Sequence, residues 1–372
     1  MNTEQYLDEL RSVVNIDCGT QTVAGVACVA DRFATWYQQA GWHTERVNLG
    51  ERVGPGMFVT NHADAEQFDV LLVGHMDTVF PEGTAAERPM TVQDGRVYGP
   101  GVSDMKSGLL NILWALRSLS PAEKERLKIA VAMNPDEETG SVFSHQWIGE
   151  LAKRSAVVLV CEAARADGSL VKARKGMARY RLDFRGVAAH AGNDPHRGRS
   201  AINALAQTIV ELNGLADAEA GTTLNFGVIQ GGDAANIVAD KAHAILDLRF
   251  WNNEEYQRVH QSLSQFCSTH LLADISIQLL QEAHTPAMAP SRDTEKLMQL
   301  VEDVGEQEGI AIHWQAVGGG SDANHTAALG VPSLDGFGPI GAGFHSPAEY
   351  LELDSIAPRI RLLKQVIVRL GQ

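Results

Sequence analysis

The sequence is poor in cysteine, and its few cysteines are not spaced as pairs. Cys18, Cys28, Cys161 and Cys267 are scattered along 372 residues with no Cys-x-x-Cys spacing. That spacing is typical of structural zinc sites and redox motifs, so we expect reduced thiols that mostly pack in the core. Cys161 directly precedes an acidic residue, but a strand position is the favoured interpretation over a ligand role.

Positive charge is also scarce. The chain has 31 Lys and Arg against 46 Asp and Glu, which gives a formal net charge of -15 and a pI near 5.3. A surface of this charge repels phosphate backbones and anionic lipid, so neither nucleic acid nor a membrane is an expected partner. The surplus of carboxylates could instead serve divalent cations.

Long apolar runs are absent as well. No stretch reaches the roughly 18 apolar residues of a membrane-spanning helix, and the first ten residues lack the basic and apolar segments of a signal peptide. We therefore expect a cytoplasmic protein. With 372 residues and 44% hydrophobic content, the chain is long enough to form two domains.

Acidic residues and a histidine repeatedly follow apolar runs that are typical of buried parallel strands. Ligands of open α/β sheets bind beyond the carboxyl ends of such strands. A lone His-x-Asp pair is more often a surface pair and an acidic run is usually a solvated loop, so it is the repetition that favours a metal site. The runs 69–73, 127–133 and 156–160 are followed by His75 with Asp77, by Asp136-Glu137-Glu138 and by Glu162.

Three further polar positions are ambiguous on local evidence. A glycine-rich approach delivers Asp104 to the start of an amphipathic helix, where an N-cap role for Ser103 or Asp104 is the favoured local interpretation. Gly318-Gly319-Gly320 permits close backbone approach to a ligand or is simply a flexible turn. His345 follows another glycine turn, and it matches the earlier pattern only by its position.

The pattern changes after residue 175, where strictly alternating strands begin. Strands are predicted at 178–185, 223–230, 242–250 and 274–280, and helices at 200–213 and 254–271. The order β-α-β-β-α-β is that of a ferredoxin-like domain. The prediction is therefore an α/β catalytic domain over 1–175 and 286–372, with a mostly parallel sheet and helices on both faces, interrupted by an α+β domain over 176–285.

Taken together, these motifs resemble the two-zinc metallohydrolases of the glutamate carboxypeptidase, aminoacylase, acetylornithine deacetylase and succinyl-diaminopimelate desuccinylase family. The resemblance covers nearly the whole chain. Ser107 departs from it, because many relatives have glycine there. The motifs that carry the resemblance are His75-Met76-Asp77, Gly101 to Lys106, Asp136-Glu137-Glu138, Gly186 to Gly192, and Gly319-Gly320-Ser321-Asp322.

The resemblance implies a ligand set for two Zn²⁺ ions per chain, with Co²⁺ or Mn²⁺ as substitutes. Asp104 would bridge the two ions and the Asp104–Met105 peptide would be cis. His75 and Glu162 would complete one site, and Glu138 and His345 the other. Imidazole and carboxylate ligands suit zinc.

It also implies the catalytic and substrate residues. Glu137 would be the general base and Asp77 would orient His75. His190 would stabilise the oxyanion in a neighbouring subunit's site, which makes the inserted domain a dimerisation and lid domain; from the residues alone a turn histidine is favoured. Substrate would also contact Asn236, Arg249 and Gly319, although an outward charge is the ordinary expectation for Arg249 in an alternating strand.

The expected function is hydrolysis of an amide or peptide bond that releases an amino acid with a free carboxylate, in the manner of glutamate carboxypeptidase. An N-acyl-amino-acid deacylase or a dipeptidase is the main alternative, and a non-catalytic metabolite-binding relative is a further one. Relatives specific for glutamate place a lysine shortly after the third carboxylate ligand. The corresponding stretch 165–169 has none, while Lys172 and Lys175 lie further on.

Overall fold

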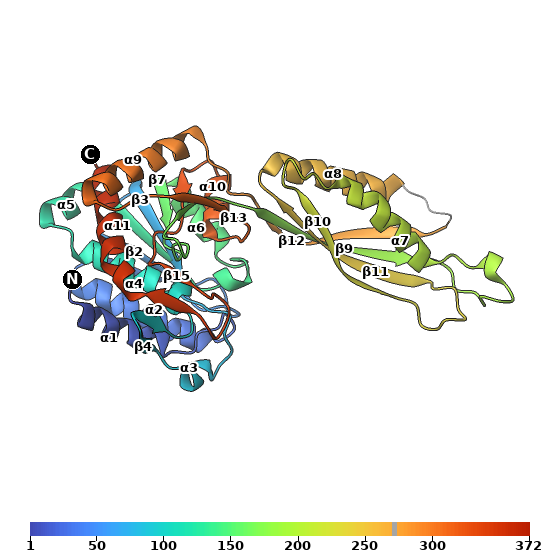
Figure 1. Cartoon of the computed structure of the whole chain (residues 1–372), viewed down its shortest axis with the longest axis horizontal. Coiled ribbons are helices and arrows are strands. Elements are labelled where there is room, and N and C mark those ends of the chain that lie inside the picture. Colours follow the sequence, from blue (N-terminus) through green and yellow to red (C-terminus); the bar gives the residue numbers. More distant parts are fainter. Residues whose placement is uncertain (270–273) are drawn as a thin grey trace. The chain divides into compact units, whose positions relative to one another are not determined.

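The computed structural model describes residues 1–269 and 274–372 and divides into two compact units (Figure 1). The first unit comprises Met1–Ala173, Ala289–Val317 and Ser321–Gln372. The second comprises Arg174–Met288 together with Gly318–Gly320. The chain thus leaves the first unit once for a long excursion and returns to it, and the sequence-based prediction set the inserted domain at 176–285.

A six-stranded sheet forms the centre of the first unit, in the order β1-β2-β6-β3-β7-β14. β3 lies between β6 and β7 and is parallel to both, and β14 is parallel to β7, whereas β1 and β2 add an antiparallel edge. The continuous runs of Val, Leu, Ile and Ala suit strands that are buried on both faces. The strand bounds are β1 His43–Val47, β2 Gly56–Thr60, β3 Phe68–His75, β6 Ile129–Asn134, β7 Ser155–Val160 and β14 Ser333–Leu334.

Helices cover both faces of this sheet, as predicted. Val70 and Leu72 of β3 pack in one core with α1, α2, α4, α9 and α11, while the alternate residues Leu71 and Val73 are equally buried outside that core. The second face is covered by α6 and α10, which contact β7. The bounds are α1 Thr3–Val14, α2 Val23–Gln39, α4 Ser107–Arg117, α6 His145–Lys153, α9 Arg292–Glu308, α10 Asp322–Ala328 and α11 Ile356–Leu370.

Smaller elements complete the first unit. A four-stranded sheet has the order β15-β16-β5-β4, and β13 pairs with β8. Short helical segments lie in the connections between the larger elements. The bounds are β4 Thr91–Gln93, β5 Arg96–Tyr98, β8 Leu170–Arg174, β13 Trp314–Val317, β15 Gly341–Ala342, β16 Tyr350–Glu352, α3 Thr84–Glu87, α5 Pro121–Arg126, η1 Val102–Lys106, η2 Glu137–Thr139 and η5 Leu353–Ser355.

The second unit has the predicted order β-α-β-β-α-β and an antiparallel sheet, β10-β11-β9-β12. Its helix α7 begins at the predicted cap, where the Ser200 hydroxyl accepts a hydrogen bond from the Asn203 N–H. The last two residues of the helix predicted at 254–271 lie outside the described residues. The bounds are β9 Gly176–Arg185, η3 Pro195–Arg197, α7 Ala201–Leu212, η4 Asn213–Leu215, β10 Thr223–Gly231, β11 Lys241–Phe250, α8 Asn253–Thr269 and β12 Ser276–Thr285.

In the part of the chain that the structure describes, every helix is too short or too polar to span a bilayer.

Candidate metal centre

The carboxyl ends of three neighbouring parallel strands bring the predicted ligands of the first unit together. β3 ends at His75, η2 follows β6 with Glu137 and Glu138, and Glu162 stands two residues beyond β7. Because β3 is parallel to both β6 and β7, these ends share one edge of the sheet. The repeated polar residues after apolar runs therefore do mark one place in the fold.

His75 is fully buried at the centre of this edge. Its Nδ1 lies 2.9 Å from the backbone oxygen of Asp77, so Nδ1 carries the proton and donates it there. Its Nε2 then presents a lone pair, and it lies 3.0 Å from an Asp104 oxygen and 3.4 Å from a Glu162 oxygen. An imidazole fixed in this tautomer is ready to ligate a cation through Nε2.

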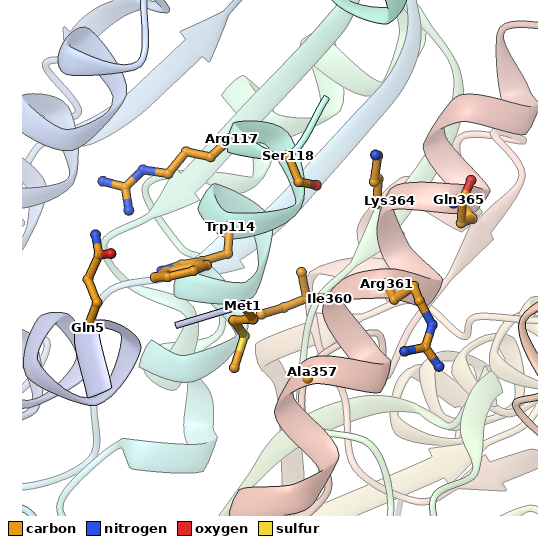
Figure 2. Close-up of a pocket in the computed structure, with 10 residues that line it drawn as sticks. All are labelled: Met1, Gln5, Trp114, Arg117, Ser118, Ala357, Ile360, Arg361, Lys364 and Gln365. Atoms are coloured by element: carbon orange, nitrogen blue, oxygen red, sulfur yellow. The ribbon is translucent and has the colours of Figure 1, made fainter. Parts of the chain in front are cut away.

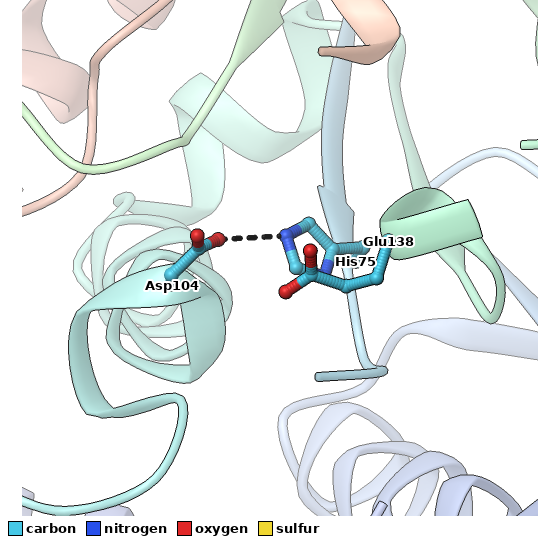
Figure 3. A group of neighbouring side chains, drawn as sticks. All are labelled: His75, Asp104 and Glu138. Carbon is cyan, nitrogen blue, oxygen red and sulfur yellow. Dashed lines mark hydrogen bonds and ion pairs between the residues drawn. The ribbon is translucent and has the colours of Figure 1, made fainter. Parts of the chain in front are cut away.

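Asp104 faces both histidines of the predicted ligand set. Its Oδ1 lies 3.0 Å from His75 Nε2, and its Oδ2 lies 3.2 Å from His345 Nε2. His345 Nε2 is also 3.1 Å from a Glu138 oxygen. Figure 3 shows His75, Asp104 and Glu138 reaching toward one another from three different elements, and their ligand atoms lie within 4.8 Å of one another. A carboxylate with one oxygen toward each histidine is suited to bridge two cations.

The backbone around Asp104 is not that of an ordinary helix start. The Asp104–Met105 peptide is cis, as expected, and both residues have non-helical dihedral angles inside η1. The N-cap of α4 is Lys106. The interpretation of Ser103 or Asp104 as an N-cap, which the local sequence favoured, is therefore wrong.

Glu349 holds this segment in place, and sequence reasoning missed it. Its buried carboxylate accepts hydrogen bonds from the backbone N–H groups of Gly101, Ser103 and Asp104, at 3.0, 2.8 and 3.0 Å. Burial raises the pKa of Glu349 to about 7 even though these three bonds favour the charged form. Its only sequence signal was an acidic residue four positions after His345.

Asp77 supports the opposite side of the site. Its buried carboxylate lies 3.4 Å from His75 Nδ1. The same carboxylate accepts hydrogen bonds from the backbone N–H groups of Glu137 and Glu138, at 3.1 and 3.2 Å. The Thr20 hydroxyl donates a further bond of 2.6 Å to it. Asp77 therefore fixes the ring of His75 and the loop of two further candidate residues at once.

The charges at this edge fit divalent cations. Burial alone would raise the pKa of Asp104, but its contacts with the His345 and His75 imidazoles outweigh that effect and hold the pKa well below its usual range. Burial raises the pKa of Glu162 to about 7 and that of Glu137 well above its usual range. Four crowded carboxylates and two imidazoles form a donor set with excess negative charge, which bound divalent ions would balance.

Comparison with known proteins agrees with this geometry. The model of Peptidase family M20/M25/M40 matches residues 71–369, which include all five predicted ligands. The chain belongs to this family. It is therefore a metal-dependent peptidase or amidohydrolase.

The proteins that are similar to this M20/M25/M40 chain are named for different activities. Carboxypeptidase G2 of Pseudomonas sp. (strain RS-16) is 28% identical over 97% of this chain and 88% of its own length. The aminopeptidase PepT structure from Bacillus cereus has a TM-score of 0.83 at 22% identity, with full coverage of both chains. The metallo-carboxypeptidase Sso-CP2 structure from Sulfolobus solfataricus has a TM-score of 0.73 at 16% identity and covers 99% of each chain. Both structures support the fold.

The remaining predicted residues of the M20/M25/M40 chain belong to the second unit. The segments of His190 and Asn236 run side by side, because the Ala191 N–H donates to the Asn236 carbonyl at 2.9 Å and His190 is bridged to Ile237. Both His190 and Asn236 are exposed.

Arg249 and Gly319 already have partners in this unit. Arg249 forms two hydrogen bonds with Asp247, 2.7 and 3.2 Å long, and is about one-third exposed. The Gly319 carbonyl accepts a 2.9 Å bond from Arg174. A ligand carboxylate at Arg249 would thus meet a guanidinium that is already oriented by a neighbouring acid.

Proposed function

We propose that this chain is a two-zinc hydrolase that cleaves an amide or peptide bond and releases an amino acid with a free carboxylate, as a carboxypeptidase of the glutamate carboxypeptidase type. The observation that carries the proposal is Asp104, which presents one oxygen to each of two histidines among three further carboxylates. The similarity to carboxypeptidase G2 over 97% of the chain supports the carboxypeptidase choice.

In this proposal Asp104 bridges two Zn²⁺ ions, with His75 and Glu162 on one and Glu138 and His345 on the other; Co²⁺ or Mn²⁺ are substitutes. The distances support this division, since His75 Nε2 lies near Glu162 and His345 Nε2 lies near Glu138. When bound, such a pair of ions lowers the pKa of a water molecule and polarises the scissile carbonyl.

Glu137 is the proposed general base. Its backbone N–H is held by Asp77, its Oε2 lies 3.9 Å from His75 Nε2, and it offers an oxygen within 4.8 Å of the ligand atoms of His75 and Glu162, so it stands directly beside the proposed ligands. Burial raises its pKa well above the usual range, and the nearby carboxylates Glu162 and Asp322 add to that effect. A carboxylate with a raised pKa can take a proton from water and return it to the leaving nitrogen.

His190 is the proposed oxyanion donor. Its Nδ1 accepts hydrogen bonds from the backbone N–H groups of Gly192 and Asn193, at 3.1 and 3.0 Å. The proton of the neutral ring must then reside on Nε2, because Nδ1 is used as an acceptor. The exposed Nε2–H is a donor that could stabilise the negative oxygen of a tetrahedral intermediate.

Asn236, Arg249 and Gly319 are the proposed substrate contacts. Asn236 is exposed beside the His190 segment, which supports a role at the same substrate. Arg249 suits bidentate capture of a substrate carboxylate, with Asp247 fixing one side of its guanidinium. The Gly319 backbone could approach a ligand closely because glycine has no side chain. The space beside it is open, since a Cβ built there would meet no other atom within 4 Å.

A homodimer through the second unit is the proposed assembly, in which His190 acts in the partner's site. The outer edge of β10 has no strand paired to it among the described residues, and Val228 and Ile229 on that strand are about half exposed. An open edge with exposed apolar residues is a typical surface for pairing with a second copy.

An N-acyl-amino-acid deacylase or a dipeptidase is the second candidate. The stretch 165–169 after Glu162 lacks a lysine, and Lys175 instead donates a 2.7 Å bond to the Gly221 carbonyl. The sequence after Glu162 therefore does not favour glutamate over other side chains. A non-catalytic metabolite-binding protein is the third alternative, and it would have no use for the complete set of proposed ligands and Glu137.

The test is hydrolysis of a panel of dipeptides and N-acyl-amino acids by the zinc-loaded protein, with and without a chelator. We expect chelator-sensitive release of an amino acid, two zinc ions per chain by elemental analysis, and a loss of about 10²- to 10⁴-fold in kcat for Glu137→Gln with zinc retained. Unchanged turnover in Glu137→Gln would refute the base assignment, and no hydrolysis of any substrate would favour the binding protein.

A further inference from the structure

A pocket of about 600 Å³ opens between three helices of the first unit and contains none of the residues assigned above. α1, α4 and α11 supply its walls (Figure 2). Its volume lies within the range of small-molecule sites. Both the metal ligands and Glu137 lie outside its lining, so it is a separate site.

One wall of the pocket is apolar and held rigidly. The Trp114 indole N–H donates a 2.7 Å bond to Glu9, and the Arg117 guanidinium lies 5.9 Å from the indole centroid while bonding the same carboxylate. Ile360 on α11 adds an aliphatic surface. A ring whose polar edge is already satisfied can offer its face to an apolar or aromatic group at little entropic cost.

The second feature of the pocket is the positive charge of its lining. Among the described residues that line the pocket three are cationic and none is acidic, in a chain whose net charge is -15. Arg117 and Arg361 are oriented by ion pairs with Glu9 and Glu308, at 2.8 and 2.9 Å. Within residues 1–269 and 274–372, no carboxylate lies at ion-pair distance from Lys364, which is half-buried. Lys364 acts on Glu123 only through its charge, which adds to the Ser120 backbone hydrogen bond in lowering the pKa of that carboxyl group.

Lys364 and Arg361 are three residues apart on α11 and so share a face of that helix. Both lie in its first nine residues, away from the negative end of the helix dipole, whereas Arg117 stands at the carboxyl end of α4. An anionic group is therefore held best on the α11 side, with its apolar body against Trp114.

We propose that this pocket binds a small aromatic carboxylate, with the ring on Trp114 and Ile360 and the carboxylate on Lys364. The proposal is independent of the hydrolytic function. A free acid is recognised and its uncharged amide is not, because the amide leaves the ammonium of Lys364 without an anion.

The test is calorimetric titration of the zinc-loaded protein with naphthalene-1-acetate and with naphthalene-1-acetamide. Two variants probe the pocket in different ways. Lys364→Glu reverses its charge, and Ala357→Trp fills it from an exposed position on α11. Lys153→Glu, on the exposed surface of α6, is the control with the same change of charge.

We expect the acid to bind the wild type and the control equally and to bind each pocket variant at least tenfold more weakly, with the amide also at least tenfold weaker in the wild type. Hydrolytic activity should not change in any of the three variants, which confirms that they fold. Equal affinity of the wild type and both pocket variants would overturn the proposal, since the acid would then be bound elsewhere, for instance at the zinc ions. Equal affinity for acid and amide would overturn it as well.

Discussion

The residues of the candidate metal centre fall into those that face the cation positions and those that hold them. His75, Asp104 and Glu162 could be proposed from the sequence, since ligand chemistry is a property of the side chain itself. Glu349 could not, because it acts on backbone N–H groups 245 to 248 positions earlier in the chain. No local pattern encodes a contact of that range.

Glu349→Ala should disorganise the Asp104 segment. It removes one carboxylate that satisfies three backbone donors, and each buried donor left unpaired costs about 1–3 kcal/mol. We expect roughly 10- to 100-fold weaker metal binding together with a lower free energy of unfolding. Metal titration and urea denaturation measure the two effects.

The matched control is Glu352→Ala on β16, whose carboxylate forms a half-exposed pair with Arg96. Its cost should stay within about 1 kcal/mol. If the two variants bind metal equally well, Glu349 does not position Asp104.

Arg249→Gln tests substrate recognition at a single residue. Because the guanidinium is the proposed partner of the substrate carboxylate, KM should rise far more for peptides with a free carboxylate than for their carboxamides. Charge-assisted hydrogen bonds contribute about 1.5–3 kcal/mol, which corresponds to roughly a 10- to 100-fold change. Steady-state kinetics on matched acid and amide substrates measure the difference, and an equal rise in KM for both would exclude the role.

At the level of elements, the strands that end at the site could be predicted from the sequence. The segment that carries Asp104 could be predicted only in part. β3, β6 and β7 are apolar runs buried on both faces, so their carboxyl ends are visible in the sequence. The Asp104 segment instead depends on close packing between α4 and the end of β7. Gly108 is the point of contact, because a Cβ there would lie 2.0 Å from the Cys161 carbonyl oxygen.

Gly108→Ala should therefore destabilise the protein although alanine is the better helix former by about 1 kcal/mol. The added methyl must push α4 away from β7, and overpacking of this kind costs about 1–3 kcal/mol. The shift would also separate Asp104 from Glu162, so zinc affinity should fall. Urea denaturation and zinc titration check both results.

Gly214→Ala is the control, since its Cβ would meet no atom within 4 Å. That variant should lose neither stability nor zinc. An equal or higher stability of Gly108→Ala would show that α4 can shift freely and that the contact does not set the position of Asp104.

At the scale of the whole molecule, the residues proposed for catalysis are divided between the two units. The first unit holds the five proposed ligands and the proposed base, and the second holds His190, Asn236, Arg249 and Gly319. Alternation of polar and apolar residues is enough to predict the second unit's sheet. It does not indicate which subunit His190 serves, since that depends on contacts between folded chains.

Mixing two inactive variants tests whether His190 acts in its own subunit's site or in the partner's. If His190 acts in the partner's site, a dimer of one Glu137→Gln subunit and one His190→Ala subunit contains one complete site. Random reassociation of equal amounts should then restore about a quarter of wild-type activity, since about half of the dimers are mixed and each has one working site. The measurement is hydrolysis before and after reversible dissociation of the mixture, with each variant treated alone as the control. If activity stays at the level of the separate variants while mixed dimers are detected by mass, His190 serves the site of its own subunit, and dimerisation is not part of catalysis.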